Sequence, residues 1–393
     1  MEVFLAMSII LATTFIFQEL FKKFNFPVVV GQILVGILLG IPLLKGIIFT
    51  SVTTNTIEFL SKLGILFLLF LVGLEIDIKK LKKTAKDSLL IGISAAIVPF
   101  IFGFLFLRFL GYDFLSSLIF GGALCVTAEA TKAKVLLDLK KLNTKLGAIM
   151  IGAGAVDDIF EVFFLSIVTI LAFGKGVEEL VFFPFEIIIF GVISFFFFYL
   201  LKKIVKYTEK KESVVEFFTV VIIFLFLIAS LSEILRIGYL IGALVAGFLF
   251  QISTRDLKSK KKEKEIVEVT KIITLGFIIP FFFTNVGLNF NYSNVASNAL
   301  LIIGTIVIGF LGKIIGTLVV KPFSNLNLKQ LYLIGWAMNS RGAVELVIAL
   351  MAKEFNLISS ELFSALVVMT MVTTLSFPFI LQRQIKRNPK IMD

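Results

Sequence analysis

The chain has 393 residues, of which 58% are apolar and 46 are phenylalanine, and its formal net charge is +11. Long apolar runs separated by short basic clusters are typical of a polytopic helical membrane protein and exclude an ordinary soluble domain. Cys125 is the single cysteine and histidine is absent, which excludes internal disulfides and leaves carboxylates to handle any protons. The lysines lie mainly between the apolar runs, so we do not expect nucleic-acid binding.

The apolar runs predict an all-α fold of about thirteen membrane-spanning helices. In chain order these are expected at 3–21, 28–48, 56–74, 86–110, 114–137, 144–173, 183–205, 213–235, 237–250, 272–289, 299–320, 330–352 and 359–381. Most Lys and Arg residues fall in connections that follow odd-numbered spans, including "KKLKKTAK" (79–86) and "RDLKSKKKEK" (255–264). The positive-inside rule then predicts a multi-pass cell-membrane protein with its N-terminus outside and its C-terminus in the cytoplasm.

The two halves of the chain contain similar segments in nearly constant register. Glu19 matches Glu233 at an offset of 214, and "VGLEID" (72–77) recurs as "VGLNFN" (286–291) at the same offset. The Gly31–Gly36 pair matches Gly242–Gly247, and "CVTAEAT" (125–131) falls opposite "NSRGAVE" (339–345). The copies lie seven spans apart, an odd number that reverses their direction in the bilayer. Helices 1–6 and 8–13 are therefore predicted to form inverted six-helix repeats, which are typical of transporters.

Polar residues interrupt the fifth and twelfth spans. The fifth carries Thr127, Glu129 and Lys132, and the twelfth carries Arg341 and Glu345. A continuous helix of this polarity is costly in lipid, so we predict two broken helices that face each other and line an ion cavity. The alternative is that Arg341 and Glu345, four residues apart, pair along an intact helix.

The sixth span contains two adjacent aspartates within "GAGAVDDIFEVFF" (152–164). Asp157 and Asp158 lie about thirteen residues into this span, which at ~1.5 Å per residue is near the middle of a ~30 Å core. Adjacent helical residues point about 100° apart, so the two carboxylates need not share one role. Such buried acids can exchange a proton for a small cation, which is an antiport mechanism. Lys313, in the eleventh span, needs an acidic partner, either for proton transport or as a structural ion pair.

The chain resembles the monovalent cation:proton antiporter family 2, which includes NapA-like sodium/proton antiporters and Kef-like transporters. The segments that carry the resemblance are 26–40, 64–77, 152–164, 238–250, 280–290, 309–316 and 337–349. The resemblance implies the fold of NhaA-like antiporters, with two unwound crossing helices. It also implies a homodimer in the lipid bilayer, an elevator-like movement of a core formed by helices 4–6 and 11–13, and no cofactor beyond the transported Na⁺ and H⁺.

The resemblance also implies roles for individual residues. Asp158 corresponds to the essential carboxylate that binds Na⁺, Asp157 to its neighbour that pairs with Lys313, and Thr127 to a small polar residue of the helix 5 break. The double aspartate implies electrogenic exchange. The family usually has neutral residues where this chain has Glu129, Lys132 and Lys134, so Glu129 adds a ligand or pairs with Lys132 or Arg341. The expected supporting charges are Lys313, Glu129, Arg341 and Glu345.

The sequence predicts a secondary-active sodium/proton antiporter, which also takes Li⁺, and not an enzyme. The nearest alternative is potassium/proton exchange on the same scaffold, and a more remote one is a gated cation channel. We expect a dimerisation domain from 1–85 and 213–297, a transport core from 86–173 and 298–382, a connector helix at 174–212 and a cytoplasmic tail at 383–393.

Overall fold

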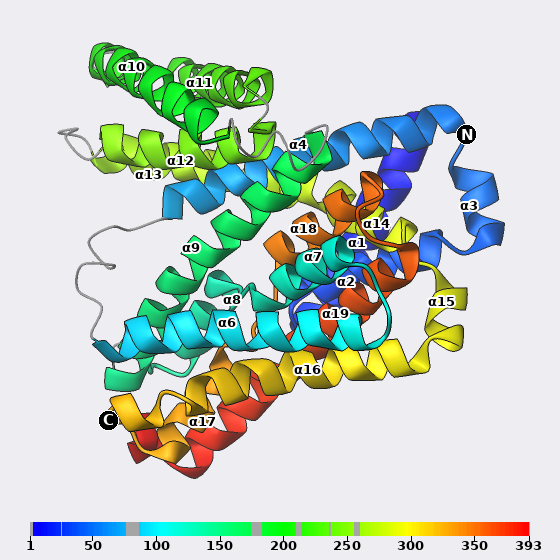
Figure 1. The fold of residues 1–393 in the computed structure, drawn as a ribbon. Coiled ribbons are helices and arrows are strands. Elements are labelled where there is room, and N and C mark those ends of the chain that lie inside the picture. The colour runs from blue at the N-terminus through cyan, green and yellow to red at the C-terminus, as the bar shows by residue number, and fades with distance from the viewer. Residues whose placement is uncertain are drawn as a thin grey trace. The chain divides into compact units, whose positions relative to one another are not determined.

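The computed structural model describes residues 3–24, 26–75, 86–142, 144–173, 183–209, 214–235, 237–254 and 260–392. Within these ranges the regular structure is helical and contains no strand (Figure 1). The predicted basic loop at 79–86 and the end of the repeat segment 72–77 fall largely outside the described residues. Of the loop predicted at 255–264, residues 255–259 lie outside them, and residues 260–264 are helical.

Most helices begin and end close to the predicted apolar runs, but the helical segment that contains the tenth predicted span, 272–289, begins at Lys260. The first half contains α1 (Val3–Lys23), α2 (Val28–Leu39), α3 (Pro42–Ile48), α4 (Ser51–Glu75), α6 (Lys86–Phe109), α7 (Phe114–Cys125), α8 (Glu129–Asp138) and α9 (Lys145–Phe173). The second half contains α10 (Phe183–Glu209), α11 (Val214–Ile234), α12 (Tyr239–Thr254), α13 (Lys260–Ile273), α14 (Ile279–Leu288), α15 (Tyr292–Ser297), α16 (Ala299–Leu318), α17 (Leu328–Ala337), α18 (Ala343–Glu354) and α19 (Ser360–Arg387).

Several of these helices have the length and composition of a membrane span. Among the described residues seven helices qualify, or eight if α2 and α3 count together as one bent span. The chain is therefore a multi-pass, all-helical membrane protein, and the total of thirteen spans stays a prediction.

The second predicted span, 28–48, is not one straight helix. The α2 and α3 helices are bent by 85° at the break between them. Pro42 begins α3 and Ile41 before it has an extended conformation (φ −58°, ψ 133°). Proline disfavours the helical region for the residue that precedes it, so the helix stops there although the apolar run continues.

The fifth and twelfth predicted spans are both broken in the structure. In the fifth, α7 ends at Cys125 and α8 begins at Glu129, with Val126 and Ala128 in extended conformations. In the twelfth, α17 ends at Ala337 and α18 begins only at Ala343. The alternative of an intact helix through Arg341 and Glu345 is therefore wrong.

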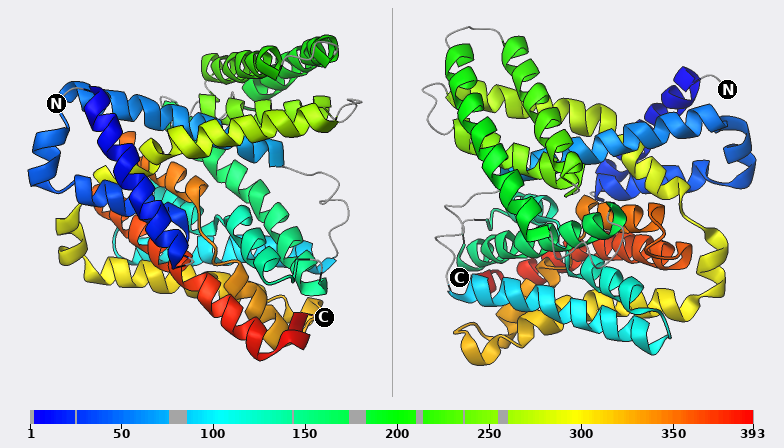
Figure 2. Two further views of the ribbon diagram at one scale, coloured as in Figure 1. Left: turned by 180° about the vertical axis from the view of Figure 1, so that it is seen from behind. Right: turned by 45° about the horizontal axis from the view of Figure 1, so that its top comes forward.

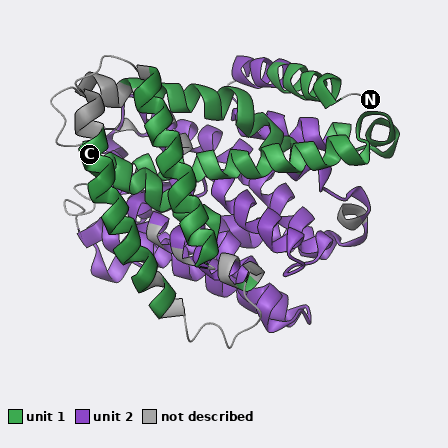
Figure 3. Ribbon diagram, turned by 90° about the horizontal axis from the view of Figure 1, so that it is seen from above, with its two compact units in different colours: residues 1–15, 38–76, 169–285 green, residues 16–37, 77–168, 286–393 purple. Residues whose placement is uncertain are grey.

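The chain divides into two compact units (Figure 3). Unit 1 comprises residues 1–15, 38–76 and 169–285, and unit 2 comprises residues 16–37, 77–168 and 286–393. Within unit 1, α4 and α12 pack with their backbones in close approach, because a side chain at Gly73 or Gly247 would collide with a backbone carbonyl of the facing helix. The predicted dimerisation and transport domains stay predictions.

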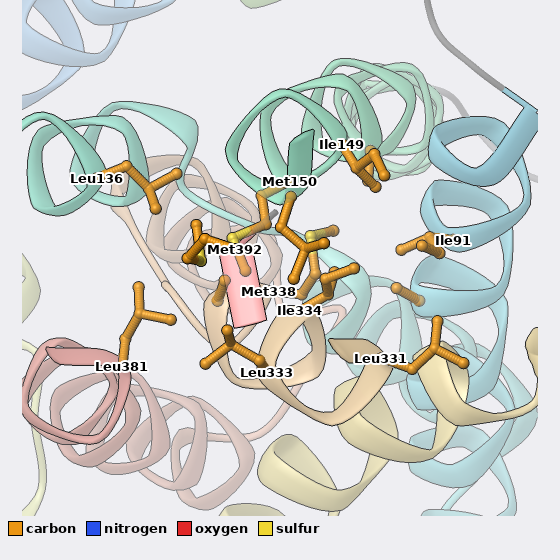
Figure 4. Close-up of a cluster of buried hydrophobic side chains, with 14 of the residues drawn as sticks. Ile91, Leu136, Ile149, Met150, Leu331, Leu333, Ile334, Met338, Leu381 and Met392 are labelled. Atoms are coloured by element: carbon orange, nitrogen blue, oxygen red, sulfur yellow. The ribbon is translucent and has the colours of Figure 1, made fainter. Parts of the chain in front are cut away.

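Unit 2 contains both broken helices. Its α6 and α16 lie side by side, and α7 packs against α6 (Figures 1 and 2). One end of the unit is held by a cluster of buried apolar side chains (Figure 4). Ile91 of α6, Leu136 of α8, Met150 of α9, Ile334 of α17 and Leu381 of α19 are among its members. This cluster packs one half of each broken helix, α8 and α17, against the unbroken helices.

Replacement of Gly247 by alanine is expected to destabilise unit 1. The new Cβ would collide with the Phe70 carbonyl on α4, and such overpacking costs about 1–3 kcal/mol. Gly191→Ala in α10 is the control, because no atom lies within 4 Å of a Cβ there, and alanine favours a helix over glycine. The midpoint of thermal unfolding in detergent, followed by circular dichroism, should fall for Gly247→Ala only, and equal midpoints for the two variants would contradict the close packing.

Candidate functional site

A buried ion pair joins α9 and α16 in unit 2. The Nζ atom of Lys313 lies 3.2 Å from Oδ1 of Asp157, and both side chains are completely buried. Glycines on α16 make room for this arrangement, since side chains at Gly312 and Gly316 would collide with Pro99 and with the backbone at Ser94 on α6. The structure thus brings Lys313 together with an aspartate of the sixth predicted span, and that aspartate is Asp157.

Lys313 also serves the broken helix α7. Its ammonium group donates a hydrogen bond to the carbonyl of Cys125, the last residue of α7. The final carbonyls of a helix have no donor within the helix, and their partial negative charge favours a cation. One lysine therefore binds a carboxylate and a helix end together.

Arg341 binds the same helix end from the other break. Its Nη1 atom donates to the carbonyls of Leu124 at 2.6 Å and Val126 at 2.8 Å, and its Nη2 atom donates to the carbonyl of Gly309 at 3.3 Å. The planar fork of a guanidinium suits several acceptors at fixed positions. From the sequence Arg341 was expected only as a supporting charge. Because a broken helix leaves carbonyls that need hydrogen-bond donors, the predicted break could have indicated that Arg341 binds them.

The two breaks are hydrogen-bonded to each other. The backbone N–H of Ala128 donates to the carbonyl of Ser340 at 2.8 Å, and the Ser340 hydroxyl donates to the carbonyl of Ala128 at 3.0 Å. Thr127 adds a bond from its hydroxyl to the carbonyl of Met338 at 3.3 Å. Each break therefore supplies donors for the other, and lipid cannot supply them.

The two adjacent aspartates have different surroundings. Asp157 is completely buried, whereas Asp158 is partly exposed. Thr127 is buried within the contact of the two breaks. The divergence that helical geometry predicts for neighbouring residues is therefore present, with one carboxylate completely buried beside Lys313 and the next one partly exposed.

The other predicted charges lie on both sides of the breaks. Glu345, in the first turn of α18, is completely buried, and its Oε2 atom is 4.0 Å from Nε of Arg341. Lys132 on α8 is buried with its Nζ atom 3.4 Å from Sδ of Met338. The side chains of Glu129 and Lys134 lie outside the described part of the chain, so the predicted pairing of Glu129 stays a prediction.

Loss of Lys313 is expected to destabilise the protein strongly. Lys313→Ala leaves a buried carboxylate and a helix end without their cation, and removing one partner of a buried ion pair costs about 3–5 kcal/mol. Lys22→Ala is the matched control, because Lys22 pairs with Glu19 at an exposed site, where an ion pair contributes little. Thermal unfolding in detergent measures both, and a loss no larger for Lys313→Ala than for Lys22→Ala would contradict a structural role of the buried pair.

Residues 7–385 match the family model described as sodium/hydrogen exchanger, transmembrane. The chain is 28% identical over 392 residues to a Na⁺/H⁺ antiporter of Enterococcus hirae, covering 97% of this chain and 98% of that one. It is 26% identical over 391 residues to the Na⁺/H⁺-K⁺ antiporter GerN of Bacillus cereus, covering 100% and 98%. The solved structure of the sodium proton antiporter MjNhaP1 from Methanocaldococcus jannaschii has the same fold, with a TM-score of 0.73, 16% identity and 98% of each chain covered. These matches confirm the family resemblance read from the sequence, and the chain belongs to the sodium/hydrogen exchanger family of transmembrane proteins.

Proposed function

We propose that this protein is a secondary-active antiporter that exchanges Na⁺ or Li⁺ for protons across a cell membrane. Membership of the sodium/hydrogen exchanger family supports the reaction, and both relatives named above are antiporters by name. Because most Lys and Arg residues follow odd-numbered predicted spans, the positive-inside rule puts the N-terminus outside and the C-terminus in the cytoplasm.

The observation that carries the proposal is the difference between the two adjacent aspartates. Asp157 is committed to Lys313 in a dry environment, whereas Asp158 beside it is partly exposed. Asp158 is then the carboxylate at which Na⁺ and protons compete, with the hydroxyl of Thr127 as a further oxygen ligand. Oxygen atoms are the ligands that hard cations prefer. An empty, charged site is costly to move through the membrane, whereas a loaded one is not.

Contacts between the two halves support the inverted repeat. Ala128 and Ser340 bond to each other across 212 residues, close to the repeat offset, as expected for equivalent residues near a pseudo-twofold axis. In unit 1 Gly73 faces the backbone of Leu244, and in unit 2 Gly287 faces the backbone of Ile33. These two contacts occupy equivalent positions in the two proposed repeats, because Gly73 and Gly287 are 214 residues apart and Ile33 and Leu244 are 211 apart.

Unit 2 contains all the side chains of the site, and we assign the moving part of an elevator mechanism to it. Unit 1 is then the scaffold of a homodimer. We also propose that the exchange is electrogenic, because the double aspartate Asp157–Asp158 resembles the pair found in electrogenic members of the family. Potassium/proton exchange is the second candidate, and it is favoured by the similarity to GerN of B. cereus, which is named a Na⁺/H⁺-K⁺ antiporter.

The proposal is tested by reconstituting the protein in liposomes with an imposed pH gradient and adding Na⁺, Li⁺ or K⁺. Na⁺ and Li⁺ should dissipate the gradient, and clamping the membrane potential at zero should speed the exchange. If no cation dissipates the gradient the antiporter proposal is wrong, and if only K⁺ does the second candidate replaces the first.

The assignment of Asp158 is tested in the same assay. Asp158→Asn should reduce exchange to the level of empty liposomes, because an amide can neither release a proton nor offer a charged ligand to Na⁺. Glu58→Gln is the control, since it removes one acid from an exposed position on α4. Normal exchange by the Asp158→Asn protein would remove this residue from the mechanism.

A further inference from the structure

A second set of buried polar atoms lies between α18 and α19 in unit 2. Both carboxylate oxygens of Glu345, the hydroxyl of Thr370 and the Nε atom of Arg341 have no hydrogen-bond partner within the described residues. Each of these side chains is at most 1% exposed. Buried polar groups are almost always hydrogen-bonded, so a group of four unsatisfied atoms at one place requires an explanation.

Arg341 does not neutralise Glu345 fully. Its two terminal nitrogens are engaged by three backbone carbonyls, and only Nε faces the glutamate. The distance of 4.0 Å from Nε to Oε2 is longer than a hydrogen bond. The charge of Arg341 is therefore shared mainly with the end of α7, and an ionised Glu345 would be poorly compensated.

Few other charged groups face Glu345. Among the described residues α7 and α19 pack most extensively against α18, and α7 has no charged residue. The charged residues of α19 lie near its two ends, at Glu361, Arg383, Lys386 and Arg387. The hydroxyl of Thr370 on α19 lies beside the Glu345 carboxylate without forming a hydrogen bond to it, and Lys313 on α16 is a more distant cation. The site is thus framed by two cations, Arg341 and Lys313, and one hydroxyl.

The cations near Glu345 favour a proton over a metal cation as the species that it binds. A second metal cation would be repelled by Arg341 and Lys313, and the orphaned set offers it only one carboxylate and one hydroxyl. A proton removes the cost of an uncompensated buried carboxylate, which is several kcal/mol. A protonated carboxyl group can also donate to Thr370 and accept from Nε–H of Arg341, and small side-chain shifts would then satisfy the whole orphaned set.

We propose that Glu345 binds a proton at a site separate from the Asp157–Lys313 pair. In this second site Glu345 is neutral and lies between α18 and α19, next to Arg341, which binds the end of α7. Its contribution to exchange rests on the proposed antiport function, whereas the presence of the proton does not. Arg341 connects the two sites, since it contacts both Glu345 and the carbonyls of the break.

The proton can be observed directly by infrared spectroscopy on the purified protein with ¹³C-labelled glutamate carboxyl groups, which separates glutamate bands from aspartate bands. Near neutral pH the wild-type protein should show the carbonyl stretch of a neutral glutamic acid. Glu345→Gln should lose this band. Glu361→Gln, which removes a glutamate bound to Tyr112 and Asn298 on the same α19, should retain it.

A further variant keeps the acid and changes only its neighbour. Thr370→Val removes the hydroxyl, so the band should move to higher frequency as the hydrogen bond is lost. Absence of the band in the wild type, or its full retention in Glu345→Gln, would overturn the proposal. The band is expected to persist in Asp158→Asn, whose transport should be abolished, so a failure of the antiport function and a failure of this inference are distinguishable.

Discussion

A backbone carbonyl inside a membrane needs a donor, and the broken helix α7 ends there with several carbonyls that its own helix cannot satisfy. Lys313 and Arg341 supply the donors, from α16 and from the second break. The cations could not stay in this place without the helix end, since a buried charge is costly without partners. The break and the two cations therefore depend on each other, and the remaining features of the site follow from this dependence.

The first consequence is the position of the acidic groups. The hydrogen bond to the Cys125 carbonyl does not neutralise the positive charge of Lys313, and the buried carboxylate of Asp157 pairs with this charge. The next residue in the helix, Asp158, is turned by about 100° and is partly exposed. On the opposite side Arg341 reaches Glu345 with only its Nε atom, which leaves that carboxyl group poorly compensated. Three acids with different surroundings therefore lie around the helix break: Asp157 is paired with Lys313, Asp158 is partly exposed, and Glu345 is buried without a hydrogen-bond partner in the described part of the chain.

Much of this arrangement could be predicted from the sequence, because hydropathy determines where a membrane helix begins and polar residues indicate where it breaks. The pairing of Lys313 with an aspartate of α9 followed from the rule that a buried charge needs a partner. The bend before Pro42 was missed, because the apolar run continues through it and hydropathy is insensitive to backbone conformation. The contacts of Arg341 and the orphaned state of Glu345 depend on how two breaks about 212 residues apart meet. No local pattern contains that information.

The central claim is that Lys313 serves the helix end and Asp157 together, so that the two side chains stabilise the protein as a unit. A double-mutant cycle on the free energy of unfolding in detergent, with Lys313→Met, Asp157→Asn and the double variant, measures this directly. The double variant should lose less stability than the sum of the single variants, by about 0.5–3 kcal/mol. Additive losses would contradict the account, because they would mean that Lys313 and Asp157 contribute to stability independently.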